Sequence, residues 1–450
     1  MATRVAKTAR LQPEKLPRTS RLTLREQIEN EIRERGPIPF SRYMELCLYD
    51  PAHGYYAANA SQFGKAGDFY TSSDIHGVFG RLLARQFEEM WQALDRPPRI
   101  EILELGPGRG LFARDVLDWS RKKFPDFFSA ATYTLQEVSP ALRGKLQNTL
   151  GEHIGADKAS VPEAGRKSAA AKASAPDGEE NVVAGKVSVP EERPKIVQQS
   201  SAGEGVGDDQ VPEGRLPCLW RTLAPDAPLI LFTNEFFDAL PVEILSPQGK
   251  LHLALENNRL HEIWLPPRAE ELEYLYRYGV HPEPGERIEV PIVAHNWIQQ
   301  IALSINRGFL LLIDYGYTRG EQLAGRHRGT LMAYRQHSVS PDPYQAPGEQ
   351  DLTAHVNFTA LAAACEQAGM RGEKLLTQSQ FLMGIGEKNQ FSDAFEDCRL
   401  PQERAKVALQ LKHLITPDGM GENFQVLMAS RGVDPNKLAA LSGLSFGRSA

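Results

Sequence analysis

The sequence predicts an α/β fold, with helices packed on both faces of a parallel, doubly wound sheet. Apolar runs of strand length alternate with stretches whose apolar residues recur every three or four positions, as in amphipathic helices. The first apolar run ends directly in a glycine-rich segment, as the first strand of such sheets commonly does. The expected strands are Ile100–Leu105, a strand ending at 135–137, Pro228–Asn234 and Gly308–Asp314.

Residues 21–98, ahead of the sheet, are expected to form a helical region. Helical spacing predicts helices over 22–35, 40–48 and 74–94. A turn-rich stretch, Asp50–Tyr56, and a glycine-rich loop that leads into Gly67 separate the last two of these helices.

The sheet domain is expected to span 99–430 and to carry additions on the substrate or partner side, at 242–290 and 320–415. Asn257-Asn258 between two apolar runs predicts a β-hairpin within 242–265. Helices are expected over 358–369 and 401–414, followed by a final strand over 424–429 and a tail over 431–450.

Two segments have the composition of disordered chain. No aromatic residue occurs between Tyr133 and Trp220, and Ala, Gly, Ser, Glu and Lys dominate the middle of this stretch. Such a segment buries too little apolar surface to offset its ordering entropy, so we expect a disordered insertion over 155–213. Residues 1–20 are basic and lack an apolar core segment, which indicates a disordered tail or an organelle-targeting peptide.

Composition excludes several classes of function. The net charge of −6 comes from 51 basic and 57 acidic residues in a mixed pattern, which does not favour nucleic-acid binding. No apolar run approaches the roughly 20 residues that span a bilayer. The four cysteines are widely separated and the histidines form no ligand-like pair, so we expect no metal. We expect a cytoplasmic location and keep the mitochondrial matrix as the alternative.

The strongest local motif runs from Glu104 to Gly110, with the sequence ELGPGRG. Glycines at a strand-to-helix turn let a ligand approach the backbone closely, where a β-carbon would collide with it. The G-x-G-x-G spacing differs from the G-x-G-x-x-G of dinucleotide binders and favours S-adenosylmethionine, which has no pyrophosphate. Glu104 suits the ammonium group of that ligand. The candidate cofactor residues here are Glu104, Gly106, Pro107, Gly108 and Gly110; a purely structural turn is the alternative.

Two further strand ends carry polar residues. Glu137, at the end of the second strand, is expected to accept hydrogen bonds from both ribose hydroxyls. Asn234, Glu235 and Asp238 follow the third strand, at the rim where the methyl group is presented. A carboxylate there fits a planar guanidinium, so Glu235 is the candidate acid and Asn234 the candidate orienting group. The alternative is an ordinary helix cap with a solvated Asp238.

Together these motifs resemble the MidA family of methyltransferases, which includes mitochondrial complex I assembly factors. The resemblance extends from about residue 20 to 430, with the insertion excluded. The matching segments, in the family's order, are His53-Gly54-Tyr55-Tyr56, Gly67 to Ser72, Glu104 to Gly110, Gln136 to Pro140, Asn234 to Val242 and Asp314-Tyr315-Gly316.

The resemblance implies a class I, seven-stranded Rossmann-like methyltransferase fold with S-adenosylmethionine as methyl donor. It also implies that Gly67, Asp68, Thr71 and Ser72 belong to the cofactor pocket. This chain has Ser73-Asp74 where the family usually has Pro-Glu, so the acid is retained with a shorter side chain and the proline is lost. The implied substrate is an arginine of a protein, such as a subunit of respiratory complex I.

Three other functions fit parts of the same pattern. A non-catalytic assembly factor would bind S-adenosylmethionine as a structural ligand, and a small-molecule methyltransferase would share the cofactor chemistry. A dinucleotide-dependent oxidoreductase would share the glycine turn and the ribose acid, but the glycine spacing disfavours it.

Overall fold

A nine-stranded sheet lies at the centre of the computed structural model, which describes residues 22–58, 77–151, 153, 186–188, 227–322, 327–335 and 338–446. The strand order is β15-β17-β10-β5-β2-β3-β4, with β14 beside β10 and β16 beside β17. Their bounds are β2 (Ile100–Leu105), β3 (Ala131–Gln136), β4 (Lys186–Ser188), β5 (Leu229–Asn234), β10 (Gly308–Tyr317), β14 (Val356–Asn357), β15 (Arg371–Gly372), β16 (Leu376–Thr377) and β17 (Phe424–Arg431). The strands from β4 to β10 are parallel as predicted, whereas β17 is antiparallel to β10.

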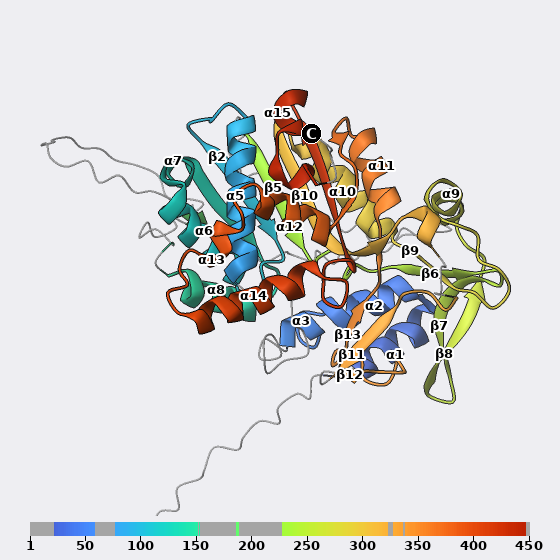
Figure 1. Ribbon diagram of the computed structural model, residues 1–450. Coiled ribbons are helices and arrows are strands. Elements are labelled where there is room, and N and C mark those ends of the chain that lie inside the picture. The colour runs from blue at the N-terminus through green and yellow to red at the C-terminus, as the bar shows by residue number, and fades with distance from the viewer. Residues whose placement is uncertain are drawn as a thin grey trace, which may run out of the picture.

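Helices cover both faces of this sheet (Figure 1). Alternate residues of β10 belong to opposite cores: Phe309 and Leu311 pack on one side, Leu310 and Leu312 on the other. This burial on both faces explains why the strands have continuous apolar runs. One face is covered by α5 (Gly77–Ala93), α6 (Leu111–Lys123), α7 (Pro125–Ala130), α8 (Pro140–Leu150), α12 (Gln378–Glu387), α13 (Ser392–Phe395) and α14 (Pro401–Ile415), and the other by α10 (Ile292–Ser304) and α11 (Phe358–Gln367).

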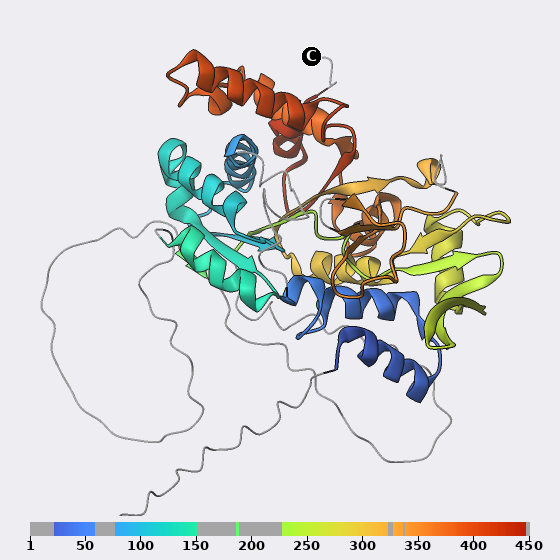
Figure 2. The same ribbon diagram turned by 90° about the horizontal axis from the view of Figure 1, so that it is seen from below.

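The N-terminal helices pack on a second, smaller sheet (Figure 2). They are α1 (Leu24–Arg35), α2 (Phe40–Tyr49) and α3 (Tyr55–Ala58). This sheet contains β1 (Ile38–Pro39), β6 (Glu243–Ser246), β7 (Gly249–Glu256), β8 (Arg259–Leu265) and β9 (Ile288–Val290), and α9 (Ala269–Tyr278) packs beside it. A three-stranded sheet of β11 (Met332–Arg335), β12 (Ser338–Val339) and β13 (Asp351–Thr353) follows η3 (Arg319–Glu321).

The predicted hairpin is confirmed. Strands β7 and β8 pair antiparallel from Lys250–Leu265 to Glu256–Arg259, which leaves Asn257 and Asn258 as a two-residue turn. Both asparagines have positive φ, 51° and 58°, as the turns that match the twist of paired strands require.

The sequence assigns no structure to the tail over 431–450, yet much of this segment is ordered. Residues Pro435–Ala439 form α15 and Ser442–Leu444 form the 3-10 helix η4. Leu438, Leu441 and Leu444 are buried in the core on the α5 side. The backbone N–H and hydroxyl of Ser442 donate to the buried Glu89 carboxylate at 2.8 and 2.7 Å. The segment is ordered by these distant partners, which its own sequence does not reveal.

The predicted disordered insertion is wrong over Lys186–Ser188. These residues form β4, which pairs in parallel with β3 from Thr132 to Thr134. The open edge of β3 offers a row of backbone donors and acceptors, and pairing with it does not depend on the composition of the added strand. The remaining residues of 155–213, and the predicted N-terminal tail, lie outside the described residues.

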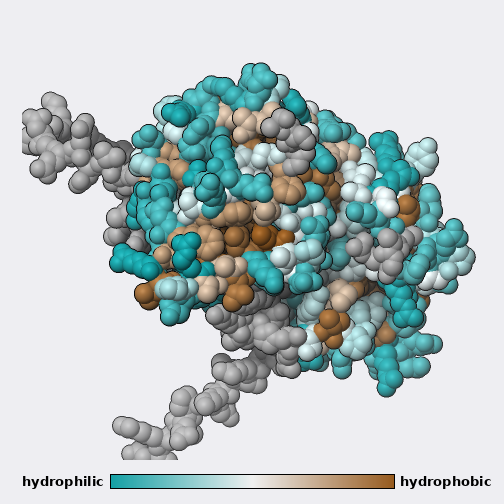
Figure 3. Space-filling model, in the orientation of Figure 1, coloured by the Kyte–Doolittle hydropathy of each residue, from teal (hydrophilic) through white to brown (hydrophobic). Residues whose placement is uncertain are grey.

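The surface seen in Figure 3 is largely hydrophilic, with apolar residues gathered in a band where Figure 1 places α12 and α14. Leu400 and Leu409 are among the large apolar side chains that are exposed, at 56% and 68%. Among the described residues, no helix is both long and apolar enough to cross a bilayer.

Candidate functional site

The glycine-rich turn between β2 and α6 combines two tight packing sites with one open position. A β-carbon on Gly106 would lie 2.9 Å from Cδ2 of Phe236, and one on Gly110 would lie 2.7 Å from Cδ2 of Leu146. Gly108 also has positive φ, 54°, but no described atom lies within 4 Å of a β-carbon placed there. The first and last glycines are therefore required by the protein's own packing, while Gly108 borders space that a ligand can occupy. Pro107 is buried, and its carbonyl accepts the N–H of Gly110 at 2.9 Å.

Glu137 follows β3 and lies directly against this turn. Its carboxylate accepts the backbone N–H of Gly108 at 3.2 Å and that of Ser139 at 2.8 Å. Burial raises the pKa of Glu137 to about 7, although these backbone donors act in the opposite direction. The two predicted cofactor segments are thus brought together, with the acid beside the open position at Gly108.

Glu104 is buried within β2, two residues before the turn. Its carboxylate accepts a hydrogen bond from the Tyr133 hydroxyl at 2.9 Å. Burial, with a smaller contribution from the negative charge of Glu137, raises the pKa of Glu104 to about 8. A nearby cation would favour the ionised form of this carboxylate, which fits the predicted role beside the ligand's ammonium group.

Asn234, Glu235 and Asp238 occupy a strained turn after β5. Glu235 has φ 52°, and its N–H donates to the Ile313 carbonyl at 3.0 Å. The Asn234 side-chain amide donates to a Glu235 carboxylate oxygen at 3.0 Å. Such a conformation is uncommon for a residue other than glycine and occurs often at functional sites. The alternative of an ordinary helix cap does not hold, because the chain turns here and continues without forming a helix.

Asp314, on the neighbouring strand β10, holds this turn in place. One of its carboxylate oxygens accepts backbone N–H groups of Phe236, Phe237 and Asp238 at 3.2, 2.9 and 3.3 Å. The other accepts the N–H of Tyr315 at 2.8 Å. Sequence analysis did not identify Asp314 as a site residue, although it begins one of the segments that carry the family resemblance.

The carboxyl groups of Asp238 and Asp314 are both buried at this turn, so a negative charge on one of them disfavours ionisation of the other. Burial, together with the charges of Asp314 and Glu235, raises the pKa of Asp238 well above its usual range. Burial also raises the pKa of Asp314 to about 7, despite its four backbone donors. Because those donors stabilise the ionised form of Asp314, we assign the negative charge to Asp314 and the retained proton to Asp238. The alternative of a solvated Asp238 does not hold, since this residue is only 2% exposed.

Tyrosines and a further acid from other parts of the chain complete the region. The Tyr56 hydroxyl donates to Asp351 at 2.9 Å, and the Tyr49 hydroxyl donates to the Ala239 carbonyl at 3.0 Å. Burial and the charge of Glu235 raise the pKa of Tyr315, and burial and the charge of Asp351 raise the pKa of Tyr334. Sequence analysis missed Tyr49, Tyr334 and Asp351, and Tyr56 was signalled only by the His53–Tyr56 motif.

Four predicted cofactor residues, Gly67, Asp68, Thr71 and Ser72, lie outside the described residues, as does Asp74. Within the part of the chain that is described, no group of His, Cys, Asp and Glu is arranged to hold a metal ion. Cys47, Cys365 and Cys398 are free thiols, and burial raises the pKa of the first two to about 12.

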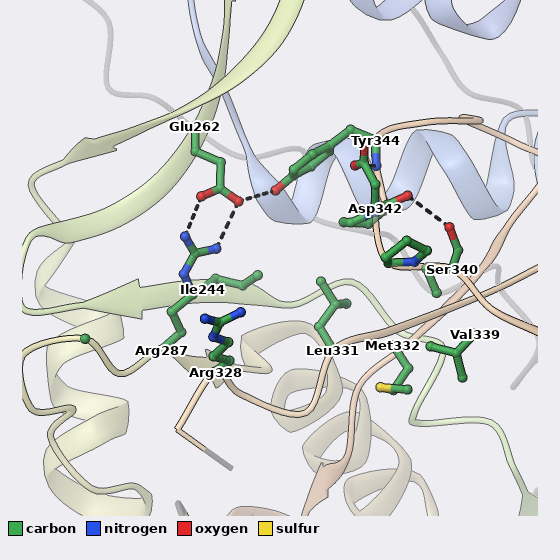
Figure 4. A pocket seen from close by; sticks show the side chains of 14 residues that line it. Ile244, Glu262, Arg287, Arg328, Leu331, Met332, Val339, Ser340, Asp342 and Tyr344 are labelled. Atoms are coloured by element: carbon green, nitrogen blue, oxygen red, sulfur yellow. Dashed lines mark hydrogen bonds and ion pairs between the residues drawn. The ribbon is translucent and has the colours of Figure 1, made fainter.

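A separate pocket of about 530 Å³ lies between the small sheet and the 328–344 segment (Figure 4). Arg287 forms a paired contact with Glu262, at 2.9 and 2.5 Å, and the Tyr344 hydroxyl donates to the same carboxylate at 2.8 Å. Leu331 and Met332 supply part of the apolar lining. We call the glycine turn, Glu137 and the Asn234–Asp238 turn together the strand-end site. None of the residues that line the pocket belongs to this site.

A glycine turn and a strand-end acid lie together at the carboxyl edge of an open α/β sheet, which is where such sheets bind their ligands. With this strand order, they define a class I S-adenosylmethionine-dependent methyltransferase. The model of a family described as "Putative S-adenosyl-L-methionine-dependent methyltransferase" matches residues 82–375, and the chain belongs to this family.

Relatives and solved structures agree with this assignment. The chain is 27% identical over 436 residues to the mitochondrial protein arginine methyltransferase NDUFAF7 homolog of Drosophila melanogaster, covering 91% of this chain and 85% of that protein. Human mitochondrial NDUFAF7 is 27% identical over 409 residues, covering 88% and 80%. A Burkholderia thailandensis protein described as a "likely methyl transferase", solved with bound S-adenosyl-homocysteine, superposes with a TM-score of 0.70 at 26% identity, covering 94% of both chains. The predicted fold, enzyme class and cofactor are confirmed: this is an α/β methyltransferase that uses S-adenosylmethionine.

Proposed function

We propose that the protein transfers the methyl group of S-adenosylmethionine to a guanidino nitrogen of an arginine in a protein substrate. The observation that carries the proposal is the position of Glu235 and Asp238 on one turn at the sheet edge that also holds Gly108 and Glu137. The names of the relatives, which are protein arginine methyltransferases, support the same substrate class.

The residues present fit the cofactor. We assign the open space at Gly108 to the ligand, Glu137, which is hydrogen-bonded to Gly108, to the ribose hydroxyls, and the buried Glu104 to the ammonium group. When bound, S-adenosylmethionine supplies a sulfonium-activated methyl group and its own leaving group. The protein therefore needs to orient the nucleophile and manage its proton, and orientation alone contributes about 7–11 kcal/mol in well-aligned systems.

In the proposed mechanism Glu235 binds the guanidinium and receives its proton. A guanidinium has a pKa above about 12, so it does not lose a proton before reaction. The carboxylate of Glu235 pairs with the cation, fixes the plane of the attacking nitrogen and accepts the proton late, directly or through water. Asn234 holds Glu235 through its 3.0 Å amide hydrogen bond.

The test is a Glu235→Gln variant. We expect kcat to fall by about 100-fold or more, as for loss of a proton acceptor. The dissociation constant for S-adenosylmethionine should stay near that of the parent, because Glu235 is assigned to the substrate. The exposed Glu256→Gln is the matched control and should change neither quantity. Transfer of label from S-adenosylmethionine to total protein, followed by acid hydrolysis and amino-acid analysis, measures the activity.

Two results would contradict the proposal. Label recovered on lysine or on a small molecule would overturn the arginine assignment. Equal loss of turnover and cofactor binding in Glu235→Gln would overturn the role of Glu235.

The particular substrate and location are further parts of the proposal. The family resemblance points to a subunit of a respiratory complex I as the substrate. The names of the relatives place those proteins in mitochondria, which supports the mitochondrial matrix over the predicted cytoplasmic location. Mass spectrometry of complex I from cells with and without the protein tests the first point: a methylarginine that disappears with the protein supports it, and an unchanged set of methylarginines contradicts it.

A further inference from the structure

Asp351 reaches the strand-end site from a separate part of the fold. It begins β13, in the three-stranded sheet, and the backbone N–H of Ala354 just beyond this strand donates to the Asp238 carbonyl at 2.9 Å. This hydrogen bond joins the end of β13 to the turn after β5. Both side chains are buried, Asp238 at 2% and Asp351 at 0% exposure. The segment 320–357, an addition to the sheet domain, thus contributes Asp351 to a site whose other acids belong to the sheet domain.

Asp238 has an unused acceptor at this junction. Its Oδ1 atom is buried and has no hydrogen-bond partner in the described part of the chain. The charged neighbours that act on Asp238 are Asp314, Glu235 and Asp351, all of them acids. A buried carboxyl oxygen without a hydrogen-bond partner is costly even when the group keeps its proton, so this position favours an incoming hydrogen-bond donor, and the surrounding acids favour a donor that is cationic.

Four tyrosines that are only partly buried lie near these buried acids. Tyr49 and Tyr56 lie with ring centroids 5.6 Å apart, and burial together with the charge of Asp351 raises the pKa of each. Tyr315, on β10, and Tyr334, on β11, also interact with the acids: burial and the charge of Glu235 raise the pKa of Tyr315, and burial and the charge of Asp351 raise that of Tyr334. Neutral aromatic rings beside carboxylates form the kind of surroundings that a delocalised cation prefers.

We propose that Asp351, positioned by the Tyr56 hydroxyl, acts with Asp238 to determine that the pocket accepts a guanidinium rather than an ammonium group. This inference rests on the proposed function and adds a specificity element to it. A guanidinium carries donors on more than one edge of a plane, so it can contact Glu235 on one side and the Asp238–Asp351 pair on another. A guanidinium is also less strongly hydrated than an ammonium group and stacks on aromatic rings. Its transfer from water to a position beside the tyrosines therefore costs less desolvation free energy.

The experiment measures binding of Nα-acetyl-arginine amide and Nα-acetyl-lysine amide to the full chain saturated with S-adenosyl-homocysteine. The variants are Asp351→Asn, which removes the charge at constant size, and Tyr56→Phe, which removes only the hydroxyl that positions Asp351. Glu349→Gln is the matched control, because it lies two residues from Asp351 and its side chain is 62% exposed. Affinity for S-adenosyl-homocysteine and the melting temperature report whether a variant keeps its fold.

The parent should prefer the arginine amide over the lysine amide. Asp351→Asn should lose about tenfold or more in arginine affinity, as for loss of a charge-assisted hydrogen bond, and should reduce the preference for arginine over lysine. Tyr56→Phe should show the same loss to a smaller degree, while Glu349→Gln should match the parent. Affinity for S-adenosyl-homocysteine should be unchanged throughout.

The contradicting outcomes separate the two proposals. If the parent binds the arginine amide and both variants bind it equally well with the same preference, the role of Asp351 is wrong and the proposed function stands. If both variants lose S-adenosyl-homocysteine together with arginine, Asp351 supports the fold and not specificity. If the parent shows no preference for the arginine amide, the guanidinium site itself is wrong, and the proposed function fails with it.

Discussion

Glu104 shows how burial sets the charge of a single residue at the cofactor site. With a pKa of about 8, this carboxyl is protonated over most of the neutral range before the cofactor binds. An incoming ammonium group favours the ionised form, so binding of the cofactor is coupled to release of a proton. Because the proton is lost more readily at higher pH, cofactor affinity should rise with pH until about 8.

This coupling gives a test at Glu104. We expect the affinity of the parent for S-adenosylmethionine to rise between pH 6 and pH 8, and Glu104→Gln to bind more weakly and to lose this part of the pH dependence. Calorimetric titration in two buffers of different ionisation enthalpy measures proton release directly. The cofactor's own amine titrates equally in both experiments, so the difference between parent and variant isolates Glu104. An identical pH profile in the variant would contradict the assignment.

Residues differ in how far the sequence reveals their roles. Gly106, Gly108 and Gly110 could be predicted as a turn because their spacing is local and glycine has a distinct conformational range. Asp314 and Asp351 could not be identified from local pattern. Each acts through partners 76 or more positions away along the chain, and an isolated acid at a strand end is usually solvated.

At the scale of elements, the structure of the C-terminal segment likewise depends on distant partners that the local sequence does not reveal. Three leucines recur every three positions in α15, in η4 and between them: Leu438, Leu444 and Leu441. Their burial depends on α5, whose Glu89 and Gln86 accept hydrogen bonds from Ser442 and Gly443. The hairpin turn at Asn257-Asn258 was predictable from two residues, since its requirement for positive φ is local. Strand β4 was not predictable, because a short edge strand forms only through backbone pairing with the strand beside it.

Leu441 provides a test of this C-terminal packing. It is 2% exposed, and Leu441→Ala leaves a cavity in the core, so the free energy of unfolding should fall by about 2–5 kcal/mol. Leu409→Ala on α14 is the control: this side chain is 68% exposed, and its removal should change stability by less than about 0.5 kcal/mol. Urea unfolding followed by circular dichroism measures both. Equal stability of the two variants would show that the segment after residue 431 behaves as the tail that the sequence suggested.

At the scale of the whole molecule, three regions meet at one edge of the sheet. The sheet domain contributes the glycine turn, Glu137 and the Asn234–Asp238 turn. The N-terminal helices contribute Tyr49 and Tyr56, and the three-stranded sheet contributes Asp351 and Tyr334. The sequence predicts the first contribution well, because the order of strands and helices determines which strand ends lie together. The other two depend on how the additions pack on the sheet, which periodicity and composition do not encode.

The most direct test of this account is calorimetric titration of the purified protein with S-adenosylmethionine, beside Gly108→Val and Gly36→Val. Both glycines have positive φ, and no described atom lies within 4 Å of a β-carbon at either, so both variants carry backbone strain without a collision inside the protein. We predict binding by the parent and by Gly36→Val, and none by a folded Gly108→Val, whose side chain fills the space assigned to the cofactor. Failure of the parent to bind, or binding by Gly108→Val at parental affinity, would contradict the assignment of the cofactor site.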